Sequence, residues 1–276
     1  MTFERLTPSM TLSMRDNFSR EILVFKDVST CSSSRAISKS VVTFERNRNI
    51  SSSIMRWIPL EANPKVMNEY MNNLGVVDSV WKFTDVFSLD DDMLAFIPQP
   101  VISLLFLYPL GNSIENASLG VEDNSSKVIL IKQTVGNACG TIAILNAIAN
   151  NRDKLSIKDG SFLSNALDGI EDMTPAERGA VMESKKDLSM LHEKSALEGQ
   201  TNAPDAESKT NLHFVCFVEH CGSLYELDGR KNAPIRHGSI TSAGFLSDTC
   251  NVVKKFIANS PDTVDFSLMA LCPENN

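Results

Sequence analysis

Cysteine, histidine and net positive charge are all scarce in this sequence of 276 residues. The six cysteines include no C-x-x-C pair and form no dense disulfide framework. Lys and Arg number 26 against 34 Asp and Glu, so the net charge is −8, and we expect neither nucleic acid nor an anionic membrane as a partner. No run approaches the ~18 apolar residues of a membrane helix. No secretory signal is recognisable, and we expect free thiols in the cytoplasm, with the nucleus as an alternative.

The first 54 residues differ in composition from the rest of the chain. They contain twelve serines and a net charge of +3, which leaves −11 for residues 55–276. No hydrophobic period is sustained, so we predict a disordered Ser-rich extension over 1–54 and a catalytic domain over 55–276. A mitochondrial transit peptide is an alternative that the acidic residues disfavour, and a translation start at Met55 is another.

Several elements of the second part can be bounded from their end signals. Thr174-Pro175-Ala176-Glu177 predicts a helix start with a capping box. Apolar periodicity and turn residues predict the other elements: helices over 65–74, 89–96 and 248–258, and strands over 81–87, 101–108, 128–132 and 266–271.

A candidate nucleophile follows the predicted strand 128–132. Residues 139–149 are almost wholly apolar and predict a buried helix after a polar loop. Cys139 would begin this helix, where free N–H groups and the helix dipole stabilise a thiolate and can hold an oxyanion. Gln133 is a candidate second oxyanion donor. A buried structural cysteine is the alternative.

A candidate base lies at the mouth of the apolar strand predicted over 213–219. This strand and a second one over 224–227 are joined by a turn, so residues whose numbers sum to about 441–443 should face each other. His213 is then a near neighbour of Asp228, and a carboxylate beside an imidazole fixes its tautomer and stabilises the imidazolium. An ion pair that only closes the hairpin is the alternative.

The other three histidines have weaker claims to a role. His192 stands in a polar, charged stretch and is predicted to be solvated on the surface. His220 stands at the hairpin turn and is predicted to be exposed. His237 precedes a glycine in a loop, and a structural and an incidental role both remain open for it.

Cys139, His213 and Asp228 stand in the order of an acyl-transfer triad. The thiolate would attack a carbonyl, and Gln133 and the N–H of Cys139 would hold the oxyanion. The His213 imidazolium would protonate the leaving amine, and water would hydrolyse the thioester. This chemistry needs no metal and no organic cofactor.

These residues lie in blocks that resemble the signature blocks of the ubiquitin carboxyl-terminal hydrolases. The blocks are residues 133–141, 211–214 and 224–230. Residues 56–64 resemble the start of the short L-type members, with most likeness to the isozyme L3 type. The similarity extends from about Met55 to about Cys272.

The resemblance implies an α/β fold of papain-like cysteine hydrolases, with an antiparallel β-sheet flanked by helices and a knotted backbone. It implies an active-site crossover loop from about Leu191 to Asn211, which would restrict leaving groups to small or unfolded ones. It also implies the roles of nucleophile, base, orienting acid and oxyanion donor for Cys139, His213, Asp228 and Gln133.

The implied activity is removal of amide, ester or thioester adducts from the C-terminal glycine of ubiquitin, with NEDD8 as a second candidate, by a monomeric enzyme. Candidate substrate contacts are Glu61, Asp85, Leu212 and Asn137, and the acidic domain suits the arginines of ubiquitin's tail. A non-catalytic ubiquitin-binding protein is one alternative, which the intact catalytic set disfavours. A peptidase acting on unrelated peptides is another, which the polar loop disfavours.

Overall fold

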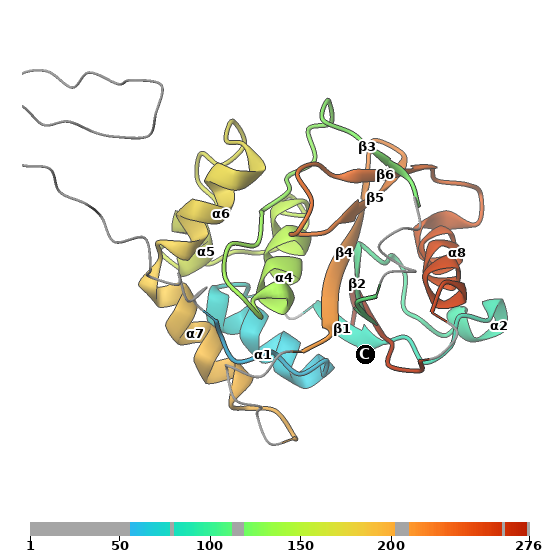
Figure 1. Ribbon diagram of the computed structural model, residues 1–276, viewed down its shortest axis with the longest axis horizontal. Coiled ribbons are helices and arrows are strands. Elements are labelled where there is room, and N and C mark those ends of the chain that lie inside the picture. The colour runs from blue at the N-terminus through green and yellow to red at the C-terminus, as the bar shows by residue number, and fades with distance from the viewer. Residues whose placement is uncertain (1–55, 78–79, 112–118, 202–209, 261–262, 275–276) are drawn as a thin grey trace, which may run out of the picture. The chain divides into compact units, whose positions relative to one another are not determined.

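The computed structural model describes residues 56–77, 80–111, 119–201, 210–260 and 263–274. A β-sheet stands at the centre of this part of the chain, with helices on both of its faces (Figure 1). The helices are α1 (Pro64–Leu74), α2 (Asp91–Leu94), α4 (Cys139–Ala149), α5 (Phe162–Ala166), α6 (Pro175–Glu183), α7 (Lys186–Ala196) and α8 (Gly244–Ala258). The strands are β1 (Trp81–Asp85), β2 (Ser103–Pro109), β3 (Val121–Glu122), β4 (Leu212–His220), β5 (Ser223–Leu227), β6 (Ile235–Ser239) and β7 (Ser267–Pro273).

The seven strands have the order β1-β7-β2-β4-β5-β6-β3, and every neighbouring pair is antiparallel. Successive side chains of a strand point to opposite faces of the sheet. In β2, Leu105 therefore packs into one hydrophobic core, and Leu104 and Phe106 pack into the other. Helices α1 and α4 to α7 cover the first face, and α2 and α8 cover the second (Figure 1). The predicted α/β class with a helix-flanked antiparallel sheet is confirmed.

Helix α4 is confirmed with the predicted bounds, and its residues 140–149 are all buried. A helix that is apolar around its whole circumference must be covered on all sides. Helix α4 packs on β4 and contributes Ile142, Ile144 and Leu145 to the first core. At Gly140, an added Cβ would lie 3.2 Å from Leu60 Cδ1 and 3.4 Å from Phe214 Cδ2, so the first turn of α4 has almost no spare space.

The predicted strand over residues 128–132 is wrong, although the segment is buried for most of its length. Side-chain amides of α4 and of the residue that follows it replace a strand neighbour. The Ile129 N–H donates to Asn150 Oδ1 at 2.8 Å, and Asn150 Nδ2 donates back to the Ile129 carbonyl at 2.8 Å. The Ile131 N–H donates to Asn146 Oδ1 at 2.8 Å. Burial was readable from the apolar run, but the partner of its backbone was not.

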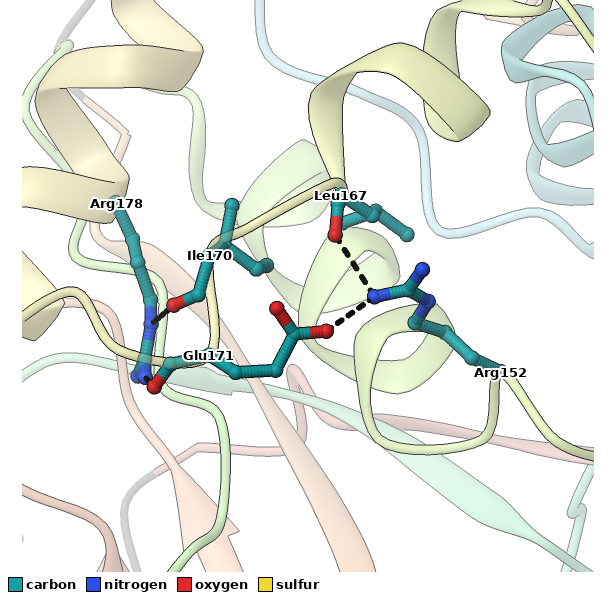
Figure 2. Close-up of polar contacts among 5 residues, drawn as sticks. All are labelled: Arg152, Leu167, Ile170, Glu171 and Arg178. Carbon is teal, nitrogen blue, oxygen red and sulfur yellow. Dashed lines mark hydrogen bonds and ion pairs between the residues drawn. The ribbon is translucent and has the colours of Figure 1, made fainter.

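The same segment is held from its other side by Arg178 of α6, which is buried. Its guanidinium donates to the carbonyls of Ile170 at 2.7 Å, Glu171 at 2.8 Å and Leu130 at 3.3 Å. Figure 2 shows Arg178 beside the Ile170 and Glu171 carbonyls, with the Glu171 side chain turned toward Arg152 at 2.6 Å. The buried Arg178 side chain thus joins the α5–α6 connection to the segment that precedes Gln133.

Two other expectations need correction, and two fall outside the described residues. Residues 191–196 are the end of α7, so the polar stretch predicted as a crossover loop is helical at its start. His192 is 1 % exposed and faces the interior, so its predicted surface position is wrong. The predicted extension 1–54 and loop residues 202–209 lie outside the described residues. Within the described ranges, none of the helices combines the length and apolar character needed to span a bilayer.

Helix α6 begins with the predicted capping box, in which Thr174 and Glu177 bind each other's backbone N–H groups. The segment around Lys132 lies very close to this helix. Lys132 N–H donates to the Pro175 carbonyl at 3.1 Å, and a Cβ added at Gly179 would lie 2.4 Å from the Lys132 carbonyl oxygen. Only glycine fits at residue 179 without moving the segment that precedes Gln133.

This close approach predicts that Gly179→Ala destabilises the protein, although alanine is the better helix former by about 1 kcal/mol. We expect the free energy of unfolding to fall by about 1–3 kcal/mol, as for other overpacked sites. Ala180→Gly, at an exposed position of the same helix, is the control and should cost about 1 kcal/mol. Urea unfolding measures both, and a Gly179→Ala variant that is more stable than the wild type would contradict the prediction.

Candidate active site

The structure brings His213 and Asp228 together at the end of the β4–β5 hairpin. The hairpin turns at Cys221 and Gly222, which have φ angles of 48° and 72°, and pairing ends at Cys216 with Leu227. Asp228 follows the last paired residue, and its Oδ1 accepts from His213 Nε2 at 2.7 Å and from the Arg230 N–H at 2.8 Å. The carboxylate is thereby fixed in orientation by the turn that follows β5.

Both members of this pair are buried, with His213 3 % and Asp228 1 % exposed. Burial alone would lower the pKa of His213, but hydrogen bonds to Asp228 and Cys139 outweigh it and raise the pKa to about 9. Burial is likewise outweighed at Asp228, whose pKa is lowered by His213 and by the Arg230 N–H. The protonated ring therefore stabilises the fold fully below its unfolded-state pKa of about 6.5, and this contribution is lost as the pH rises through about 9.

Cys139 is the first residue of α4, and its thiol interacts with the His213 ring. Because Asp228 occupies Nε2 of that ring, Nδ1 is the nitrogen left to face the sulfur. No side chain caps α4 at Ala138, so the N–H groups of its first turn remain for another acceptor. Cys139 is half-buried, whereas Cys216, Cys250 and Cys272 are fully buried and Cys221 is exposed.

Gln133 lies beside this site, because its N–H donates to the carbonyl of Gly229, the residue after Asp228, at 2.8 Å. Its side-chain Nε2 donates to the Val135 carbonyl at 2.9 Å, and its Oε1 is buried without a partner among the described residues. A primary amide carries two N–H donors. One of them binds the Val135 carbonyl, and this bond fixes the plane of the amide.

The loop before Cys139 is held by the segment that precedes α1. The Trp57 N–H donates to the Gly136 carbonyl at 2.9 Å, and Asn137 Nδ2 donates to the Trp57 carbonyl at 3.0 Å. Asn137 has a φ of 61°, a left-handed conformation that asparagine tolerates better than most residues. Asn137, predicted as a substrate contact, thus lies two residues before Cys139 and also shapes the loop that enters α4.

The remaining predicted substrate contacts lie in different surroundings. Glu61 accepts from the Thr201 N–H at 3.0 Å and the Thr201 hydroxyl at 2.8 Å. These bonds lower the pKa of Glu61, and the bond from the Thr201 N–H has the largest effect. Its carboxylate therefore already binds the chain after α7. Asp85 ends β1, and burial raises its pKa. Leu212 begins β4, one residue before His213.

Two histidines gain a place that the sequence did not indicate. His192 lies in the core beside Trp57, with ring centroids 4.5 Å apart. His237 Nε2 donates to Glu226 Oε2 at 2.8 Å in a second buried pair, which involves no cysteine. Both residues have polar neighbours in the sequence, which gave no sign of burial. The groups that bury their rings belong to other elements of the fold.

Comparison with known proteins agrees with this geometry. Residues 57–258 match the family model for ubiquitin carboxyl-terminal hydrolase, family 1. The chain belongs to this family. Ubiquitin carboxyl-terminal hydrolase 3 of Arabidopsis thaliana is 40% identical over 227 residues, which cover 80% of this chain and 96% of that protein. Human ubiquitin carboxyl-terminal hydrolase isozyme L1 is 38% identical over 224 residues, or 79% of this chain and 99% of that one.

Solved structures of the family share the fold. The catalytic domain of Trichinella spiralis UCH37 bound to ubiquitin vinyl methyl ester superposes with a TM-score of 0.65 at 22% identity, covering 79% of this chain and 96% of that one. The described part of this ubiquitin carboxyl-terminal hydrolase therefore has the family's arrangement of sheet and helices.

The charge arrangement predicts that Asp228→Asn lowers the pKa of His213 from about 9, because only Cys139 then opposes the effect of burial. NMR titration of the His213 ring measures this shift. Glu226→Gln is the matched control, since it removes a buried carboxylate that binds a histidine on the same sheet. A His213 ring that still titrates near 9 in Asp228→Asn would show that the carboxylate is not the source of the shift.

Proposed function

We propose that this chain is a deubiquitinating cysteine hydrolase that cleaves adducts from the C-terminal glycine of ubiquitin. The observation that carries the proposal is one half-buried thiol at an uncapped helix start, next to a buried His–Asp pair. A thiol with a base and an orienting acid in this order can perform nucleophilic acyl transfer. Membership of the family and the ubiquitin-bound relatives support ubiquitin as the partner.

Each residue of the site has a distinct role in this reaction. Cys139 attacks the carbonyl carbon as a thiolate, and the ring of His213 carries the proton that the thiol has lost. The imidazolium then gives this proton to the leaving amine, and a thioester to Cys139 remains. Asp228 keeps the ring in position and stabilises its charged form. Water, deprotonated by the neutral ring, hydrolyses the thioester and restores the thiol.

The negative oxygen that forms during the attack needs donors that are already in place. The free N–H groups at the start of α4 supply one, and the second N–H of the Gln133 amide supplies another. The Val135 carbonyl and the contact of Gln133 with Gly229 hold this amide before substrate binds. Little reorganisation is then needed as charge develops.

The substrate is proposed to reach the thiol with its tail along an acidic surface. Asp85 is the stronger candidate for contact with an arginine. Burial raises its pKa, and a nearby cation would offset the free-energy cost of keeping the carboxylate charged. Glu61 is the weaker candidate, because Thr201 already binds its carboxylate. NEDD8 is a second substrate candidate. The chain is proposed to act as a monomer. A reducing compartment is proposed because the cysteines of the described residues are free thiols.

The assignment of Cys139 predicts which thiol a ubiquitin-derived electrophile modifies. Ubiquitin with a C-terminal vinyl methyl ester should label the wild-type chain once, at Cys139, as read by peptide mass mapping. Cys139→Ala should lose labelling and turnover, yet bind ubiquitin within a few-fold of the wild-type affinity. Cys221→Ala, which removes the exposed thiol, should keep both. A label on another cysteine, or none, would exclude the proposal.

The domain assignment predicts that residues 1–54 are not needed for catalysis. A chain that begins at Met55 should hydrolyse a fluorogenic ubiquitin C-terminal amide at the rate of the full chain, because every residue of the site lies after residue 55. Steady-state kinetics of the two chains measure this. A large loss of kcat in the shorter chain would make the extension part of the catalytic domain.

A further inference from the structure

His192 is a buried titratable residue that the proposed reaction does not use. It projects from α7 into the first core and is 1 % exposed. Its Nδ1 lies 2.7 Å from the Thr141 hydroxyl oxygen, and its Nε2 lies 2.6 Å from the Ile58 carbonyl oxygen. Thr141 belongs to the first turn of α4, two residues after Cys139. The ring therefore joins α7 to the first turn of α4 and to the segment before α1.

The hydrogen bonds of this ring can have only one direction. A carbonyl oxygen only accepts, so His192 Nε2 carries a proton and donates it to Ile58. In the neutral ring Nδ1 must then accept from the Thr141 hydroxyl. The Thr141 oxygen, having given its hydrogen to the ring, accepts from the Tyr70 hydroxyl at 2.9 Å. A directed chain thus extends from α1 through α4 to α7 and ends on the segment before α1.

The surroundings of His192 keep it neutral. Burial lowers its pKa to about 4, against a smaller opposite effect of the Ile58 carbonyl. The groups that face the ring are Trp57, Ile58, Tyr70 from α1 and Thr141 from α4. Tyr70 is the titratable one among them, and burial raises its pKa. No carboxylate of the described residues makes a contact with this ring, unlike His213 with Asp228.

The segment that His192 binds also holds the loop in front of Cys139. Ile58 follows Trp57, whose carbonyl accepts from Asn137 and whose N–H donates to Gly136. Displacement of Ile58 would therefore move the loop that enters α4. Displacement of Thr141 would move the first turn of α4 directly.

We propose that His192 is a positioning residue for Cys139, which as a neutral ring fixes the first turn of α4 through Thr141 and the entering loop through Ile58. The inference rests on the proposed role of Cys139 and extends it to a residue on α7. The thiol must lie within reach of His213 and below the substrate carbonyl at the same time. A shift of about 1 Å in such an arrangement can cost on the order of 100-fold in rate.

The test compares variants that keep one, or neither, of the two hydrogen bonds of the ring. His192→Phe keeps an aromatic ring beside Trp57 but has neither bond. We expect kcat for a ubiquitin C-terminal amide to fall about 10- to 100-fold. KM should stay within about two-fold of the wild-type value, because a change of geometry at the thiol alone does not require a larger change in KM. His192→Asn places an acceptor where Nδ1 lies and should recover most of this loss.

Thr141→Val removes the same bond from its other end with little change in shape, so it carries the test even where His192→Phe fails to fold. We expect a loss of kcat no larger than that of His192→Phe, which also lacks the bond to Ile58. The double variant should lose no more than His192→Phe alone, because residues that share one bond are not additive. Ser195→Ala is the control. Ser195 is buried on the same helix, its hydroxyl has no partner among the described residues, and its loss should leave kcat unchanged.

Stability and rate separate the outcomes. Urea unfolding of each variant shows the structural cost, and single-turnover kinetics with folded protein show the cost at the thiol. The proposal is overturned if the variants lower stability while kcat stays at the wild-type value, or if the losses of His192→Phe and Thr141→Val multiply. Failure of the proposed function looks different, because the wild-type chain itself would then not be labelled at Cys139.

Discussion

The burial of α4 is the constraint on which the rest of the structure depends. Residues 140–149 are covered on every side, so the helix is partly exposed only at Cys139, its first residue. The first turn carries the thiol and the free N–H groups that a thiolate and an oxyanion need. Its neighbours must therefore come close, as Leu60 and Phe214 do at Gly140. Covering the helix and exposing its start are two requirements that one arrangement of the surrounding segments meets.

Polar side chains, rather than a strand neighbour, hold the chain that enters this site. Asn146 and Asn150 bind the backbone of residues 129–131, and Arg178 binds the carbonyl of Leu130. Buried backbone groups without such partners would each cost about 1–3 kcal/mol. The segment can therefore stay irregular and still be buried, which lets it turn toward Gln133 and Cys139.

Two histidines that are equally buried differ in charge because only one of them has a partner that offsets burial. His213 and His192 are 3 % and 1 % exposed. Burial acts against the charged form of both rings, but a carboxylate and a thiol beside His213 raise its pKa to about 9, whereas burial lowers the pKa of His192 to about 4. The first ring can serve as acid and base in a reaction. The second donates to a carbonyl and accepts from a hydroxyl, which suits a neutral ring that holds its neighbours in place.

The sequence by itself determined what is local: the bounds of α4, the capping box of α6, the β4–β5 hairpin and the residues that form the His–Asp pair. These follow from hydrophobic period, capping residues and turn geometry, which act within a few residues. Tertiary structure alone decided that residues 128–132 bind side chains instead of a strand, that residues 191–196 are helical, and that His192 lies in the core. These features depend on groups that are distant in the chain, such as Asn150, Ile58 and Thr141. A local sequence pattern does not indicate which distant group will form a hydrogen bond with a buried polar atom.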